Sequence, residues 1–128
     1  MHDVPALIES MRQAGLDVRL ESFEPPPELP AGLDLSVYRV VQEALTNALK
    51  HAGPARVTVR IGCRANEVTL DVRDDGLGQD APGSDDGKGL IGMRERVGLL
   101  GGELTVGPVP SGGWAVSASL PLPQAARR

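Results

Sequence analysis

An acidic residue followed by two glycines stands in the second half of the chain, in the run Asp74-Asp75-Gly76-Leu77-Gly78. Asp74 ends a pattern typical of a β-strand, and its carboxylate can accept a hydrogen bond from the exocyclic amine of adenine. Glycines beside it let the backbone pass close to a flat base, because no Cβ atom stands in the way. Such a charged hydrogen bond contributes roughly 1.5–3 kcal/mol, enough to separate adenine from guanine. The alternative interpretation is an ordinary Asp-Gly turn.

Two polar residues four positions apart, Glu43 and Asn47, lie upstream in a segment with helical spacing. Residues at this spacing share one side of a helix, where they form a polar stripe with Arg39 and Lys50. The amide oxygen of Asn47 is a hard ligand of the kind that Mg²⁺ accepts. A carboxylate one turn away can orient a water molecule or accept a proton. The alternative interpretation is a solvated helix face, although asparagine is a poor helix former.

A second glycine cluster, Gly87-Lys88-Gly89-Leu90-Ile91-Gly92, leads into a predicted helix. Free backbone N–H groups and the positive end of the helix dipole favour phosphate binding there, and Lys88 adds a cation. The cluster does not open a β-α-β unit, which argues against a dinucleotide-binding fold, and it lacks the ending of a P-loop. In this order along the chain, the three motifs indicate a pocket for a magnesium-bound purine nucleotide.

The elements that must position these motifs follow from the periodicity of the apolar residues. Helical spacing predicts helices over residues 3–14, from Asp34 or Leu35 to about His51, and over 90–100. Alternation predicts five strands: 16–23, 55–62, 67–73, 103–107 and 113–120. We expect the second and third strands to form one antiparallel hairpin, and the fourth and fifth strands to form another. Residues 24–30 read as a proline-rich connector and 75–89 as a mobile loop.

This order of elements predicts an α+β fold, a two-layer sandwich with helices on one face of a mainly antiparallel mixed sheet. With 128 residues, the chain is expected to form a single domain, 1–128, with its core over about 3–122 and a disordered tail over 123–128. Its start runs directly into a helical pattern, which suggests a piece excised from a longer protein.

Composition argues against several classes of function. The formal net charge is -4 and no basic tract is interleaved with aromatic residues, so nucleic-acid binding is not expected. No signal peptide and no bilayer-spanning apolar run is present, so we expect a cytoplasmic domain without direct membrane contact. The single cysteine, Cys63, cannot form an intrachain disulfide, and its neighbours read as a strand, which favours a buried, inert thiol.

Taken together, the motifs resemble the catalytic ATP-binding domain of bacterial two-component sensor histidine kinases. That domain belongs to the GHKL superfamily of gyrase, Hsp-type chaperone, kinase and mismatch-repair ATPases, with the Bergerat-type fold. The run YRVVQEALTNALKHA (38–52) is similar to the N box of the nitrate-sensor-like class, and 74–78 and 87–96 are similar to its two glycine boxes. Gly112-Gly113 and the ending Leu120-Pro121-Leu122 match the closing segment, so the resemblance covers about residues 3–122.

The resemblance implies roles for the residues that carry chemistry. Asn47 would ligate Mg²⁺, Glu43 would assist phosphoryl transfer, and Asp74 would bind the adenine amino group. Lys50 and Lys88 would contact phosphates. The implied cofactors are ATP and Mg²⁺, and the γ-phosphoryl group would pass to a histidine on a separate dimerisation domain, a transfer that depends on positioning and charge neutralisation.

The resemblance also implies how the glycine boxes act. Gly76 and Gly78 would shape the adenine pocket. The second box would contribute nucleotide-binding residues and the hinge of a short lid: Gly87, Gly89, Leu90 and Gly92. The lid itself would cover the phosphates over about residues 79–88.

No phospho-accepting histidine segment is expected in this chain, because His2 does not lie in a long dimerisation helix and His51 lies inside the N box. The implied partners are a histidine-bearing dimerisation domain of a parent kinase and a LuxR-type response regulator. Segments absent here would anchor that parent kinase to a membrane if it is a membrane protein. The isolated domain is expected to be a monomer. Two alternatives stay open: a stand-alone serine kinase that doubles as an anti-sigma factor, and a catalytically silent nucleotide-binding interaction module.

Overall fold

The computed structural model describes residues 3–24, 29–51, 56–64, 66–76, 83–110 and 112–122. Its elements follow the predicted order, and every strand boundary agrees with the prediction to within two residues. The elements are α1 (Val4–Gln13), β1 (Asp17–Phe23), α2 (Ala31–His51), β2 (Arg56–Arg64), β3 (Glu67–Asp74), α3 (Gly83–Leu99), β4 (Glu103–Pro108) and β5 (Trp114–Pro121). The tail predicted to be disordered, 123–128, lies outside the described residues.

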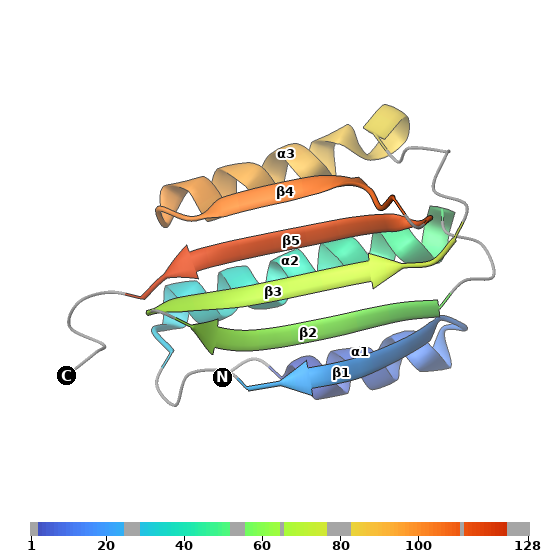
Figure 1. The fold of residues 1–128 in the computed structure, drawn as a ribbon, viewed down its shortest axis with the longest axis horizontal. Helices are drawn as coiled ribbons and strands as arrows, with labels where there is room; N and C mark the ends of the chain where they lie inside the picture. The colour runs from blue at the N-terminus through green and yellow to red at the C-terminus, as the bar shows by residue number, and fades with distance from the viewer. Residues whose placement is uncertain are drawn as a thin grey trace.

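A five-stranded sheet forms one layer of the fold, in the order β1-β2-β3-β5-β4. β1 pairs with β2 in parallel, whereas the other three pairs are antiparallel, so the sheet is mixed. Figure 1 shows all three helices on one face of this sheet. The predicted two-layer α+β sandwich is therefore confirmed. Among the described residues, no helix combines the length and the apolarity needed to cross a bilayer.

The core lies between the two layers and consists almost entirely of aliphatic side chains. Alternate residues of the central strands point towards the helices, among them Val57, Val59, Leu70 and Val72. Helix α2 covers them with an apolar stripe in which Leu45 is fully buried. Because this burial is the main favourable term in folding, it fixes α2 against the sheet and so fixes the polar side of α2 relative to the strand ends.

The first helix ends as its sequence predicts. The backbone N–H of Ala6 donates to the Asp3 carboxylate at 3.0 Å, which caps the N-terminus of α1. Gly15 follows the helix with a φ of +105°, a conformation that favours glycine. The cap and the stop therefore agree with the predicted helix over 3–14.

Two predicted helix starts are wrong. Helix α2 begins at Ala31, directly after Pro30, whose carbonyl accepts the backbone N–H of Asp34 at 2.8 Å. Helix α3 begins at Gly83, so residues 83–89 are helical and not part of a loop. Ser84, Asp85 and Asp86 give this segment the residues that helix N-termini favour, a signal that the surrounding glycines obscured. Of the predicted lid, 79–82 lie outside the described residues.

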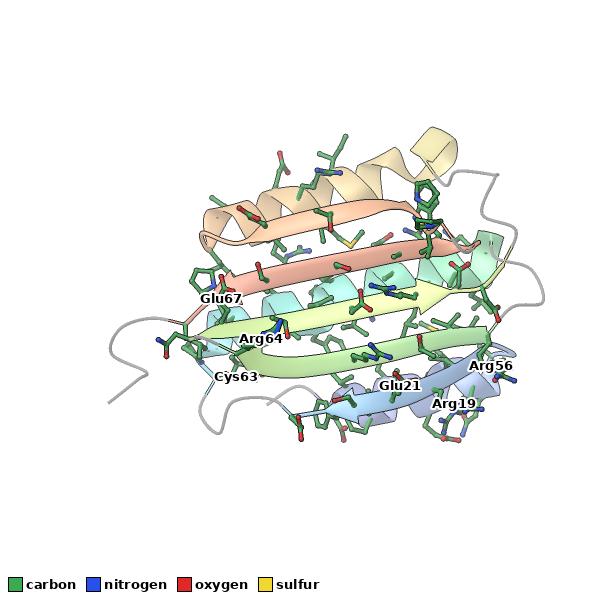
Figure 2. The ribbon with its side chains drawn as sticks, in the orientation of Figure 1. Arg19, Glu21, Arg56, Cys63, Arg64 and Glu67 are labelled. Carbon is green, nitrogen blue, oxygen red and sulfur yellow. The ribbon has the colours of Figure 1, made fainter. Side chains whose placement is uncertain are left out.

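The prediction that Cys63 is buried is also wrong, because the thiol is exposed. Its position continues the inward series of Val57, Val59 and Ile61 along β2. The pairing of β1 with β2 ends at Phe23, opposite Ile61, so no residue of β1 stands beside Cys63. Figure 2 shows Cys63 near the end of β2, close to Arg64.

Candidate functional site

Asp74 is the last residue of β3, a strand with neighbours on both sides. Alternation along β3 places its side chain on the helix-covered face with Val72, but beyond the core, where it is half-buried. The backbone N–H of Gly76 donates to the Asp74 carboxylate at 2.9 Å. Burial raises the pKa of Asp74 above its ordinary value of 3.8, backbone N–H groups of Gly76 and Trp114 lower it, and nearby Asp75 raises it. The carboxylate is thus held in a fixed place at the mouth of the interlayer space.

Two contacts of the backbone fix this end of β3. The Asp75 carboxylate accepts the backbone N–H of Arg56 at 2.6 Å, and the Asp75 N–H donates to the Arg56 carbonyl at 3.1 Å. On the other side, Gly113 has a φ of +99° and lies so close that a Cβ there would stand 1.9 Å from the Asp74 carbonyl oxygen. Only glycine permits this approach. Neither role was predicted, although both residues fall within the quoted motifs.

Asn47 lies on α2 and is 7% exposed, so its side chain is buried. Among the described residues, its Oδ1 atom has no hydrogen-bond partner. A buried acceptor without a partner costs about 1–3 kcal/mol, so this oxygen, about one turn before the end of α2, is a candidate ligand for a bound cation. Glu43 is partly exposed one turn earlier on the same side of α2, and Lys50 is exposed one turn later. The predicted polar stripe is therefore present, and its deepest member carries an unused oxygen.

That oxygen fits Mg²⁺, which prefers oxygen ligands and usually keeps several waters while it binds substrate phosphates. The described residues contain no cluster of three or more His, Cys, Asp or Glu side chains that could form a complete metal cage. A site with few protein ligands is the arrangement expected when phosphate oxygens complete the coordination. Among the predicted site residues, Asn47 offers an oxygen suited to this purpose.

The prediction that the second glycine cluster opens a helix is wrong, because the cluster lies within α3, which begins at Gly83. Gly87, Gly89 and Gly92 are all helical, and for 83–90 only the backbone is described, so Lys88 and Leu90 have no side-chain placement. At Gly92 no atom stands within 4 Å of the place a Cβ would take. Gly78 lies outside the described residues.

One end of the molecule gathers these parts. Figure 1 shows the end of α2, the end of β3 and the start of α3 at the same end of the fold. Helix α2 packs against both β3 and α3. The C-terminal half of α2, which carries Glu43 and Asn47, the end of β3, which carries Asp74, and the start of α3 therefore lie at one end of the fold.

Residues 32–124 match the family described as "Histidine kinase-, DNA gyrase B-, and HSP90-like ATPase". The chain belongs to this family. The sensor histidine kinase LnrJ of Bacillus subtilis is 32% identical over 126 residues, 92% of this chain and 31% of LnrJ. The nitrate/nitrite sensor protein NarQ of Escherichia coli is 32% identical over 124 residues, 91% of this chain and 22% of NarQ. The resemblance to sensor histidine kinases, including the nitrate-sensor class, is confirmed.

Solved structures agree with this assignment. The histidine kinase domain from the Erythrobacter litoralis EL346 blue-light activated histidine kinase has a TM-score of 0.74 and 25% sequence identity. The match covers 96% of this chain and 59% of that chain. The chain thus has the fold of a histidine kinase catalytic domain, and it spans less than a third of LnrJ and of NarQ.

Proposed function

We propose that this domain binds Mg-ATP at the end of the fold where α2, β3 and α3 meet, and presents the γ-phosphoryl group to a histidine on a separate dimerisation domain. The Oδ1 of buried Asn47 carries the proposal, because it is an acceptor without a hydrogen-bond partner among the described residues and its chemistry suits Mg²⁺. The half-buried carboxylate of Asp74, at the same end of the molecule, supports it as the acceptor of the adenine amine.

Each residue of the site has one task in this proposal. Asp74 orients the base, and Asn47 holds Mg²⁺, which supplies positive charge to the phosphate oxygens when bound. Glu43, one turn from Asn47, orients the attacking imidazole or accepts its proton. The histidine nitrogen forms the new N–P bond while the bond from the γ-phosphorus to the β,γ-bridging oxygen breaks, and ADP leaves. Positioning by rigid elements, with charge neutralisation, accounts for most of the catalysis in such a transfer.

The glycine boxes and the two lysines complete the proposed pocket. Gly76 and Gly78 line the adenine, while Gly87, Gly89, Leu90 and Gly92, which lie in α3, contribute to nucleotide binding and to the hinge of the lid over the phosphates. Lys50 and Lys88 contact phosphate oxygens. In the parent protein the acceptor domain belongs to the same kinase, a LuxR-type response regulator receives the phosphoryl group downstream, and the domain works in the cytoplasm as a monomeric unit.

Calorimetry with a non-hydrolysable ATP analogue, with and without Mg²⁺, tests the binding half of the proposal. We expect micromolar affinity that depends on Mg²⁺ in the wild type and loses this dependence in Asn47→Ala. Gln42→Ala is the matched control, because Gln42 lies on the same helix outside the polar stripe. Equal Mg²⁺ dependence in Asn47→Ala would show that Asn47 is not a ligand.

Labelled ATP tests the transfer half. The chain alone should bind ATP without acquiring phosphohistidine, and transfer should appear when a dimerisation domain of the nitrate-sensor class is added. The product should be acid-labile, as phosphohistidine is. An acid-stable phosphoserine on a partner protein would instead favour the serine kinase alternative, and binding without any transfer would favour the interaction module.

A further inference from the structure

Trp114 is the first residue of β5 and the only tryptophan of the chain. It stands directly opposite Asp74 in the antiparallel pairing of β3 with β5. Side chains directly opposite each other in such a pair project from the same face of the sheet, with Cβ atoms about 4.5–5.5 Å apart. Because Val116 and Leu120 alternate with Trp114 and are buried under the helices, this shared face is the helix-covered one.

The indole is not used by the hydrophobic core. Trp114 is only partly buried, and among the described residues it is not one of the apolar side chains that pack against the core cluster. Its backbone is nevertheless fixed, since its N–H group lowers the pKa of the Asp74 carboxylate by hydrogen bonding and Gly113 before it packs on the Asp74 carbonyl. The backbone that carries this large aromatic ring is therefore fixed beside the Asp74 carboxylate, and the ring is not part of the described core.

We propose that Trp114 forms an aromatic wall of the base pocket and stacks on the adenine whose amine Asp74 binds. This proposal rests on the proposed function, because it needs Asp74 to lie at the base. Stacking is tolerant of base identity, since every base has a π-face, whereas the carboxylate distinguishes an amine from a carbonyl. Trp114 thus contributes affinity for any purine, and Asp74 contributes selectivity for adenine.

The two substitutions should have different signatures. Loss of a stacked aromatic weakens base binding by roughly 5- to 150-fold, so Trp114→Ala should weaken the analogues of ATP and GTP to a similar extent. Trp114→Phe keeps an aromatic face and should stay within a few-fold of the wild type. Asp74→Asn should weaken the ATP analogue far more than the GTP analogue.

The fluorescence of Trp114 provides a direct readout, because no other tryptophan contributes. A titration with the Mg-bound ATP analogue should change its emission, and the change should saturate at the concentration that calorimetry gives for binding. This measurement uses the wild-type chain, so it stands even where Trp114→Ala does not fold.

The outcomes separate this inference from the proposed function. Calorimetric binding with unchanged emission, or with equal affinity in folded Trp114→Ala, overturns the aromatic wall and leaves the ATP site standing. No calorimetric binding by the folded wild type overturns both. A change in emission together with selective loss of ATP over GTP in Trp114→Ala would also overturn the division of tasks.

Discussion

Replacement of Gly113 by alanine tests how closely β3 and the start of β5 are joined at the site. Two effects add at this position. A side chain at a φ of +99° costs about 1–2 kcal/mol. In addition, the new Cβ would stand 1.9 Å from the carbonyl oxygen and 2.8 Å from the carbonyl carbon of Asp74, which are backbone atoms that cannot rotate away. Overpacking of this kind costs about 1–3 kcal/mol more.

Gly112 offers a matched control for this substitution. Its φ is +106°, but no atom lies within 4 Å of the place where its Cβ would stand. Gly112→Ala should therefore lower the free energy of unfolding by about 1–2 kcal/mol through backbone strain alone, and Gly113→Ala by about 2–5 kcal/mol. The difference isolates the contact with Asp74.

Urea denaturation of both variants at equal protein concentration gives the two free energies. Gly113→Ala should also weaken binding of the ATP analogue, because the strand end that carries the Asp74 carboxylate must shift, whereas Gly112→Ala should bind normally. Equal losses of stability in the two variants would refute the close approach, and so would normal nucleotide affinity in Gly113→Ala.

Three further changes have defined outcomes. Leu45→Ala removes a fully buried side chain and should lower the free energy of unfolding by about 2–5 kcal/mol in urea titrations; a loss under about 1 kcal/mol would mean that the core is looser than described. Asn47→Leu removes a buried acceptor without a described partner, so it should raise the free energy of unfolding by about 1 kcal/mol in the same urea titrations. It should also abolish Mg²⁺-dependent nucleotide binding. A lower free energy of unfolding would contradict the absence of a partner for the Asn47 oxygen. Because burial raises the pKa of Asp74 in the folded state, the stability that its protonated form contributes is present below pH 3.8 and is lost as pH rises through the folded pKa. Asp74→Asn should therefore be more stable than the wild type at neutral pH, with the difference shrinking in acid, and a difference independent of pH would contradict this assignment.

The sequence predicts the strands and the two hairpins, β2 with β3 and β4 with β5, because apolar residues alternate along these strands. Val57, Val59 and Ile61 are an example, since a shift of one residue would expose all three. The helical stripe of α2 is equally clear. This periodicity cannot predict burial at positions where a neighbouring strand ends. Cys63 alternates with the buried residues of β2 but is exposed, because β1 ends at Phe23.

Glycine content misled the prediction at α3. Gly87 and Gly89 have low intrinsic helix propensity, yet they lie within the helix that begins at Gly83. In the candidate site, Asn47 and Asp74 could be proposed from the sequence because both combine a chemical group with an unusual place in an element, and their roles stay predictions. The contributions of Gly113 and Trp114 depend on their register opposite Asp74, which only the folded sheet defines.

We propose that Asp74 binds the adenine amine of ATP, and calorimetry on two carboxylate variants tests this role. Asp71 lies on the same strand three residues earlier, on the open face, where it bonds Ser117 at 2.5 Å and Arg73 at 2.7 Å. Asp71→Asn is therefore the matched control for Asp74→Asn. We predict that Asp74→Asn weakens the Mg-bound ATP analogue by roughly ten- to a hundredfold and that Asp71→Asn leaves its affinity unchanged. Wild-type affinity in a folded Asp74→Asn variant, or an equal loss in both, would contradict the account.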